Sequence, residues 1–472
     1  MHIMKLVYKV LSLGFTLAMS SCESILDIDP PTDSITADVT FSTPEGIRTA
    51  ATGFYTENFL NNLMYYQGLE LYVGQISDEL LARSGQFADL SQSNYNASSS
   101  YITNLWDAPY SSIYGANDFL GHVEGSTVLP ESELNVYRGE ALFFRANAYF
   151  YLVNIFGDVP LLTTYDVSVT ATAPRAPKAE VYQQIISDLQ QTQQLLKASG
   201  NGNTRISTDA ATALLARVYL YTEQWDKAIS EANKLLPTAD GGQGSSYQLE
   251  TTERVFLTTS SETILASNQE GFTGTGSYVG YTRIGNLFIP NARATYASYY
   301  FSDELVNDVR SEPADLRNNW IGEKEGSGGR IYYYPYKYKN MTTPSAAADY
   351  ESYVILRLAE LYLIRAEASV HLGNTQQAVA DINKIRQRAA LSPYSGGTSQ
   401  DDLLLEIESQ RRKEFFFEQG HRWMDLNRTG RADAIYGSNS YKKLNWQSYK
   451  SLLPIPEMQI GRNRNLTQNP GY

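Results

Sequence analysis

The chain has 472 residues, of which 42% are hydrophobic and 19% charged, so it can bury a sizeable core and is not intrinsically disordered. Its formal net charge of −13 argues against nucleic-acid binding, because a phosphate backbone demands a basic surface. One cysteine allows no internal disulfide, and four histidines leave little for a histidine-rich metal centre. The unusual count is tyrosine, with 35 residues. Its flat ring and hydroxyl group suit a recognition surface.

The N-terminal segment, residues 1–21, is predicted to be a signal peptide. A weakly basic start precedes an apolar run from Val10 to Met19, which is too short to cross a bilayer core of about 30 Å as a helix. Cys22 follows two serines at the end of this run, an arrangement similar to the lipobox of bacterial lipoproteins, although Met19 stands where an aliphatic residue is usual. We therefore expect lipidation at Cys22; the alternative is a secreted protein with a free thiol. Residues 22–40 are acidic and contain prolines, as expected of a solvated tether.

Helical periodicity dominates the chain after residue 41. Residues 138–156 place small and apolar side chains at i, i+3 and i+4 spacing, and Gly157 and Pro160 end this helix. A second helix is predicted over residues 181–196. The rest of the chain, 41–472, is expected to form a single globular domain.

Two segments, near 208–236 and 354–389, are typical of helical hairpins of the tetratricopeptide kind. Alanines at their facing positions would let the paired helices approach closely. The spacing between the hairpins is irregular, so a regular solenoid is not expected. The predicted fold class is mostly α: a tetratricopeptide-like scaffold of helix pairs with long irregular loops and a few short strands.

A loop-rich insertion is predicted near residues 240–340. It is rich in glycine, serine, threonine and tyrosine, with short β-prone runs such as 263–266 and an aromatic stretch at 332–338. A second polar segment, 84–101, contains scattered aromatic residues. Long irregular segments on a helical scaffold are common places for binding sites.

Five runs resemble segments of the SusD/RagB family of Bacteroidetes outer-membrane lipoproteins. They are RGEALFFRANAYFYLVNIFGDVPL (138–161), ALLARVYLYTEQWDKAISEA (213–232), ILRLAELYLIRAEA (355–368), RRKEFFFEQGHRWMDLNRTG (411–430) and LLPIPEMQIGRNRNLTQNPGY (452–472). The resemblance runs in the expected order from the lipobox to the last residue.

The resemblance implies a non-catalytic glycan-binding protein, anchored by lipid to the outer membrane and facing the outside of the cell. It also implies a partner, a SusC-like TonB-dependent transporter that takes up the captured oligosaccharide or polysaccharide. Some relatives serve peptide import, so a peptide-binding or assembly module of the same kind of importer is the alternative. The family's ligand contacts lie in variable loops and cannot be transferred by position. No cofactor and no metal ion is expected.

The candidate ligand-binding residues combine aromatic rings with planar polar groups, which together suit the faces and hydroxyls of sugars. They form two groups in the sequence: Asp78, Arg83, Phe87, Tyr95, Asn96, Tyr101 and Trp106, and then Tyr278, Tyr281, Tyr296, Tyr299 and Trp320. For Trp106, a position in the helical core is an equally good interpretation. For Trp320, a ligand contact and a structural role are evenly balanced. Trp106 begins a segment with helical spacing, and Trp320 lies between two asparagines and Gly322, which suggests an exposed turn.

Catalysis is not expected. The GHRWMDL run brings His421, Arg422 and Asp425 together, but it lacks the second histidine or cysteine of a metal site. We interpret it as a helix whose neighbouring phenylalanines, 415–417, pack inward while its charges pair. A glycosidase needs two carboxylates about 5–10 Å apart. The adjacent residues Asp78 and Glu79 make a poor pair, because neighbouring side chains diverge.

Overall fold

The computed structural model describes residues 37–60, 62–83, 87–196, 203–236, 247–267, 279–291, 294 and 297–472. The predicted signal peptide and Cys22 lie outside these residues. The contacts within the chain divide it between residues 48 and 49. The described part of the first unit contains helix α2 (Ala37–Phe41) and the start of α3 (Pro44–Tyr55). The features described below belong to the second unit, residues 49–472.

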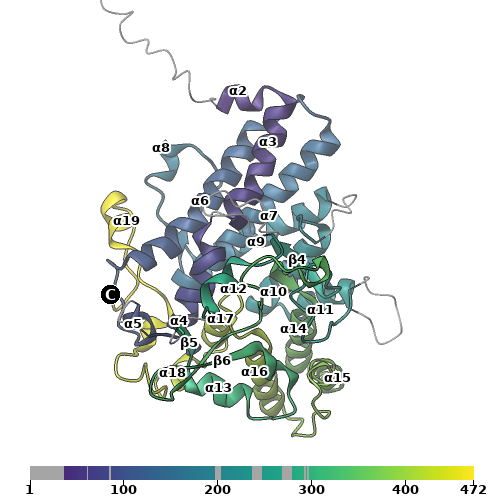
Figure 1. Cartoon of the computed structure of the whole chain (residues 1–472). Helices are drawn as coiled ribbons and strands as arrows, with labels where there is room; N and C mark the ends of the chain where they lie inside the picture. Colours follow the sequence, from purple (N-terminus) through teal and green to yellow (C-terminus); the bar gives the residue numbers. More distant parts are fainter. Residues whose placement is uncertain are drawn as a thin grey trace, which may run out of the picture. The chain divides into compact units, whose positions relative to one another are not determined.

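The first half of this unit is built around a buried helix. Helix α7 (Glu131–Phe156) packs against α6 (Ser100–His122) and α9 (Lys178–Leu195) (Figure 1). Because neighbours cover it on several sides, every residue of α7 from Gly139 to Phe156 is buried. The helices predicted over 138–156 and 181–196 are confirmed as parts of α7 and α9.

Two helical hairpins follow, as predicted. Helix α10 (Thr208–Tyr221) pairs with α11 (Trp225–Leu235), and α14 (Leu358–His371) pairs with α15 (Thr375–Arg388). Side-chain caps fix the starts of α10 and α15: the Ser207 hydroxyl accepts from the Ala210 N–H at 3.1 Å, and the Asn374 side chain accepts from the Gln377 N–H at 3.1 Å. The two hairpins also contact each other through α11 and α14. The tetratricopeptide-like scaffold is therefore confirmed.

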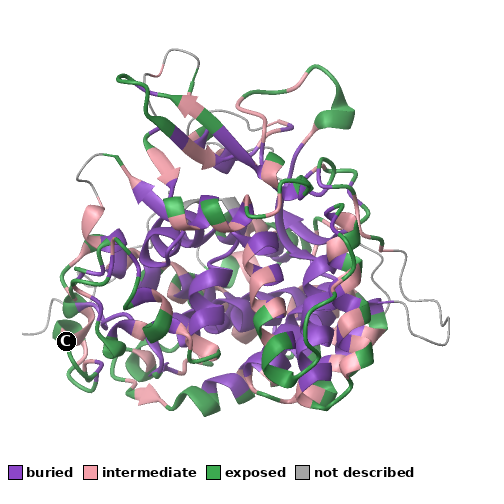
Figure 2. Ribbon diagram, turned by 90° about the horizontal axis from the view of Figure 1, so that it is seen from below, coloured by how far each residue is buried: buried purple, intermediate pink, exposed green. Residues whose placement is uncertain are grey.

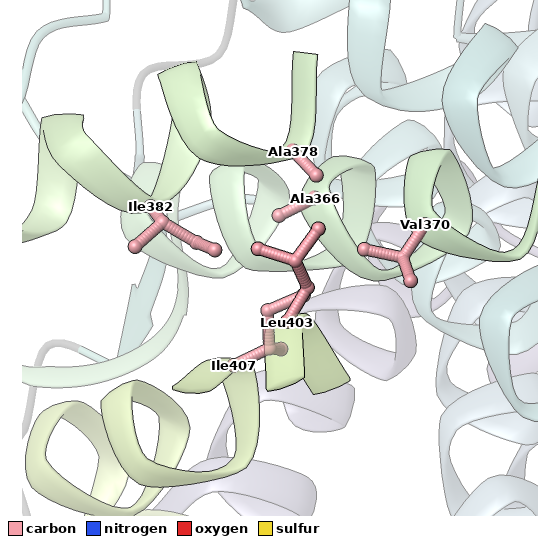
Figure 3. Close-up of a cluster of buried hydrophobic side chains, with 6 residues drawn as sticks. All are labelled: Ala366, Val370, Ala378, Ile382, Leu403 and Ile407. Carbon is pink, nitrogen blue, oxygen red and sulfur yellow. The ribbon is translucent and has the colours of Figure 1, made fainter. Parts of the chain in front are cut away.

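Helix α16 (Gln400–Phe415) packs onto the second hairpin. Six buried side chains fill this junction, two from each of the three helices (Figure 3): Ala366, Val370, Ala378, Ile382, Leu403 and Ile407. The alanines allow close approach, and each fully buried branched side chain contributes about 1.5–3 kcal/mol. The spacing of these residues keeps the opposite face of α16 free for other contacts.

Short strands pair between the helices. The antiparallel pairs join β1 (Leu80–Ala82) to β5 (Tyr299–Phe301), β2 (Val159–Pro160) to β3 (Arg175–Ala176), β4 (Thr263–Ser267) to β8 (Tyr353–Arg357), and β6 (Ile321–Glu325) to β7 (Ile331–Pro335). The β-prone run predicted over 263–266 is confirmed as β4. Strand β5 also lies against β7, so the hairpin of β6 and β7 continues the pair of β1 and β5.

Shorter elements complete the described structure. They are η1 (Thr56–Leu60), η2 (Met64–Val73), α4 (Gly74–Ile76), α5 (Ala88–Ser91), α8 (Val167–Thr170), α12 (Arg283–Phe288), α13 (Asp303–Val309), η3 (Leu316–Trp320), η4 (Ala347–Asp349), α17 (His421–Arg428), α18 (Ala432–Tyr436), η5 (Ser448–Ser451) and α19 (Glu457–Arg462). Figure 2 shows buried residues concentrated along the helices and exposed residues in the outer turns and loops.

Candidate ligand-binding surface

The hairpin of β6 and β7 displays a tyrosine-rich strand. Aromatic and β-branched residues favour an extended conformation, and consecutive side chains then alternate between the two faces. The turn after β6 contains Gly328 and Gly329 at φ of +86° and +80°, a region that glycine adopts without strain. The register pairs Gly322 with Tyr334. A Cβ atom at residue 322 would lie 2.4 Å from the Tyr334 ring, so glycine is what lets this ring cover the neighbouring strand.

An open cavity of about 650 Å³ lies beside this hairpin. Its lining combines two aromatic rings with amide, guanidinium and carboxylate groups: Arg310, Pro313, Asn318, Asn319, Ile321, Gly322, Glu323, Tyr334 and Tyr336. Arg310 is fixed by an ion pair with Glu323 at 2.7 Å and lies 4.6 Å from the centroid of the Tyr333 ring. The rings of Tyr334 and Tyr336 meet edge to face at 5.8 Å. The cavity therefore offers flat apolar faces next to polar groups that bind hydroxyls.

A second cluster of rings and cations lies where β5 meets β7. Tyr300 and Tyr332 are 5.1 Å apart, and the Arg330 guanidinium lies 5.0 Å from the Tyr332 ring. Arg83 approaches the same ring at 5.7 Å. These distances are typical of cation–π contacts, which hold the charged groups beside the rings.

We call this region the hairpin surface. It consists of Arg83, Tyr300, Arg310, Asn318, Asn319, Glu323, Arg330, Tyr332, Tyr333, Tyr334 and Tyr336. Partial burial raises the pKa of Tyr300 and of Tyr334 above the ordinary value. Their hydroxyl groups are therefore protonated at neutral pH and can both donate and accept hydrogen bonds.

Four predicted ligand contacts of the first group are buried, and the expectation that they present a face to a ligand is corrected. Burial would raise the pKa of Asp78, but ion pairs with Arg412 and Arg422, both at 2.9 Å, hold it well below its ordinary value. This carboxylate is a partner of two arginines in the interior. The other three are buried aromatic residues: Tyr95, Tyr101 and Trp106.

These three rings have structural partners. The Tyr95 hydroxyl donates to the Lys450 carbonyl at 3.0 Å. Tyr101 donates to Asp89 and packs against Phe87. Trp106 meets Phe156 edge to face at 5.0 Å, so its alternative interpretation as a core residue is the correct one.

The other members of the first group are more accessible. Arg83 belongs to the hairpin surface, and Asn96 is exposed in the turn before α6. Phe87 is half-buried, and its backbone has a φ of +64°.

The second predicted group is divided. Tyr278 and Tyr296 lie outside the described residues. Tyr281 and Tyr299 are half-buried. The expectation for Trp320 is corrected: it is fully buried, its indole N–H donates to the Thr252 carbonyl at 2.9 Å, and its ring packs against Phe256.

Sequence reasoning missed the main residues of the cavity. Asn318 and Asn319 were used only to interpret Trp320, yet they line the cavity while the tryptophan turns inward. Tyr334 and Tyr336 fall in the aromatic stretch recognised at 332–338. Their two-residue spacing was a usable signal, because it is the period of a strand with one accessible face.

The charged run at 411–430 is structural, as interpreted. Phe415, Phe416 and Phe417 are buried, and Arg411 pairs with Asp425 at 2.7 Å. Among the described residues, no group of three or more histidine, cysteine, aspartate or glutamate side chains could hold a metal ion. Within the same residues, no helix is long and apolar enough to cross a membrane.

Comparisons with known proteins agree on one family. A sequence profile described as "SusD family" matches residues 295–472, and one described as "Starch-binding associating with outer membrane" matches residues 25–220. A SusD-like protein of Formosa agariphila is 25% identical, with 98% of this chain and 99% of the relative covered. The starch-binding protein SusD of Bacteroides thetaiotaomicron is 26% identical over 75% of this chain and 76% of its own. A crystal structure of a SusD superfamily protein from Bacteroides vulgatus matches 92% of this chain and 100% of its own with a TM-score of 0.77, at 21% identity.

Proposed function

Since this chain belongs to the SusD family, we propose that it binds an oligosaccharide or polysaccharide at the outer membrane and passes it to a SusC-like TonB-dependent transporter. The starch-binding relative supports glycan as the ligand class. The observation that carries the proposal is the hairpin surface, with tyrosine rings beside planar polar groups around an open cavity of about 650 Å³.

The chemistry of this surface suits sugars. The rings of Tyr334 and Tyr336 offer faces to the C–H side of a pyranose, while Arg310 and the amides of Asn318 and Asn319 donate to its hydroxyls. Glu323 accepts from hydroxyl groups on the same side. The open cavity lets a polymer chain pass across it, so that contacts with several sugar units add up.

Five residues predicted from sequence remain proposed contributors to this binding: Arg83, Phe87, Asn96, Tyr281 and Tyr299. Tyr278 and Tyr296 are proposed on their sequence context alone. The ligand is bound and not cleaved. A lipid on Cys22 holds the protein on the outer face of the membrane, and replacing Cys22 by alanine is expected to release it from membranes of cells that lack the transporter.

Isothermal titration against a panel of soluble glycans tests the proposal. Saturable binding to at least one glycan is expected, and Tyr334→Ala should weaken it by about tenfold or more, since stacking of an aromatic ring is lost. Tyr114→Ala is the matched control, because Tyr114 is an exposed tyrosine of α6 outside the hairpin surface. Saturable binding of peptides, with no saturable binding of any glycan in the panel, would favour the peptide-import alternative. Release of new reducing ends from a bound polysaccharide would contradict binding without cleavage.

A further inference from the structure

A second cavity, of about 640 Å³, lies within the helical scaffold and shares no residue with the hairpin surface. Side chains of α10, α14, α16 and α17 line it, and these helices contact one another in the order α10, α14, α16, α17 (Figure 1). Leu403 and Ile407 of α16 pack into the cluster of Figure 3, and Ile407 also lines the cavity. Arg411, one turn further along the same stripe of α16, lines the cavity together with Glu408.

The accessible part of the lining combines aromatic and apolar groups with the exposed carboxylates of Glu223 and Asp401. The Trp225 ring stacks on His371 with 4.0 Å between centroids and 6° between the planes. Leu405 is 51% exposed in the same part of the lining. Deeper in the cavity lie the buried residues Phe415, Arg411 and Glu79. A ligand could therefore enter past flat apolar groups and reach charged groups at the bottom.

Most of the deep charges are already paired. Arg428 bonds both oxygens of Glu367, the second at 2.8 Å, and donates to Asp425 at 2.9 Å. Arg422 donates to Asp78 at 2.9 Å, and Arg431 donates to Glu408 at 3.0 Å. These pairs fix the walls of the cavity.

Arg411 differs from them. Its Nε donates to Asp425 at 2.7 Å, but its Nη1 and Nη2 atoms are buried and have no hydrogen-bond partner among the described residues. The side chain as a whole is 3% exposed. The Glu79 Oε1 atom and the Tyr221 hydroxyl, which belong to the same lining, are also buried without a partner there. Unpaired buried donors on a charged group are unfavourable, so this edge of the guanidinium calls for an oxygen-bearing molecule.

We propose that this cavity binds a small molecule bearing a carboxylate, held in a bidentate manner by the Nη1 and Nη2 atoms of Arg411. Two parallel N–H···O bonds to a planar carboxylate are the arrangement that a free guanidinium edge favours. The remainder of such a ligand extends toward the Trp225 and Leu405 side of the cavity. Uronic acid sugars and peptides with a free C-terminus both carry this group.

The surrounding charges favour a carboxylate over a doubly charged phosphate. Among the described residues of the lining, Arg411 has two unpartnered Nη atoms, whereas Arg412 has an unpartnered Nη2 atom and pairs through Nη1 with Asp78. Asp425, Glu367 and Glu408 add negative charge nearby. Burial and the neighbouring Asp78 raise the pKa of Glu79 to about 7. Glu79 is therefore often protonated at neutral pH, and in that form it donates a hydrogen bond to a bound carboxylate instead of repelling it.

Titration of the purified protein with paired probes tests the proposal. Glucuronate is compared with glucose, and N-acetyl-leucyl-glycine is compared with its C-terminal amide. In at least one pair the acid is expected to bind saturably at millimolar concentration while its neutral counterpart binds about tenfold more weakly or not at all. Which acid binds distinguishes a sugar source from a peptide source. No saturable binding of either acid, or equal binding of an acid and its neutral counterpart, overturns the proposal.

Two variants locate the site. Arg411→Lys keeps a positive charge beside Asp425 but removes the two Nη donors of the guanidinium. It should therefore weaken binding of the acid by about tenfold or more. Leu405→Trp fills the exposed mouth without touching the ion pairs and should have a similar effect even if Arg411→Lys folds poorly. Tyr114→Ala is the control that should leave acid binding unchanged, because Tyr114 is exposed on α6 and lines neither cavity. Acid binding that survives both Arg411→Lys and Leu405→Trp in folded protein contradicts the assignment.

Discussion

Arginine side chains line both the hairpin surface and the cavity of the helical scaffold, but their surroundings differ. On the hairpin surface, Arg310 and Arg330 lie over tyrosine rings at 4.6 and 5.0 Å and remain at least partly accessible. In the scaffold, Arg422 is 5% exposed and bonds both oxygens of Asp78. The comparison teaches that an arginine fixes the fold where carboxylates bind its whole guanidinium edge, as at Arg422, whereas the arginines that we propose for recognition keep part of that group available. Replacing one arginine from each region tests that contrast directly.

The largest expected effect comes from breaking a buried ion pair. Arg422→Leu leaves the buried Asp78 carboxylate with Arg412 as its remaining arginine partner and should lower the free energy of unfolding by about 3–5 kcal/mol. Arg310→Leu, which removes a more exposed ion pair, should lower it by no more than about 1 kcal/mol. Urea denaturation of both variants measures the difference. Equal losses would remove the distinction between the two regions.

A pH-dependent effect of nearly that size is expected at Glu79. Its pKa is raised from 4.5 to about 7 by burial, so the folded state retains a proton that the unfolded state loses between these pH values. The contribution of Glu79 to stability therefore falls as the pH rises from about 4.5 to about 7 and is constant above that. Glu79→Gln should lack this fall, so that its stability relative to the wild type increases by about 3 kcal/mol across the window. Parallel stability curves for the two proteins would contradict the raised pKa.

A smaller loss is expected at Trp320, where the sequence suggested a surface role. Trp320→Phe removes the indole N–H and leaves the Thr252 carbonyl without this partner, so the free energy of unfolding should fall by about 1–3 kcal/mol. Glycan affinity of the folded variant should be unchanged. A normal stability together with weakened glycan binding would instead favour the original prediction of ligand contact.

The smallest effect on stability is expected on the hairpin surface itself. Tyr334→Phe removes a hydroxyl beside an open cavity and should change the free energy of unfolding by less than about 0.5 kcal/mol. It should nevertheless weaken glycan binding several-fold if that hydroxyl contacts the ligand. Thermal denaturation and titration on the same sample separate the two readouts.

The helical scaffold could be predicted from the sequence because its signals are local. The apolar spacing of residues 138–156, the glycine after them and the paired alanines of the two hairpins are all properties of short segments. Burial of those segments follows from their own pattern. The strand at 263–266 was also visible from its β-prone residues.

The candidate ligand-binding surface was harder to predict because it depends on contacts between distant segments. Asp78 has a planar carboxylate that suits sugar hydroxyls, but Arg412 and Arg422, more than three hundred positions later in the chain, enclose it. Trp320 was placed by its flanking turn residues, whereas the buried Phe256 and Phe416 rings decide its position. No pattern within a short window of sequence contains these long-range contacts. Tyr334 and Tyr336 are the exception, because their two-residue spacing is itself visible in the sequence and indicates a strand with one accessible face.

The architecture of the hairpin has a practical consequence. Its ladder from Ile321–Pro335 to Glu325–Ile331 is formed by backbone groups, and the glycine turn that joins the strands makes few demands on neighbouring side chains. Under the proposed function, exchange of the accessible side chains between residues 323 and 334, with the buried Tyr332 retained, would alter ligand preference while the backbone ladder of the hairpin is kept.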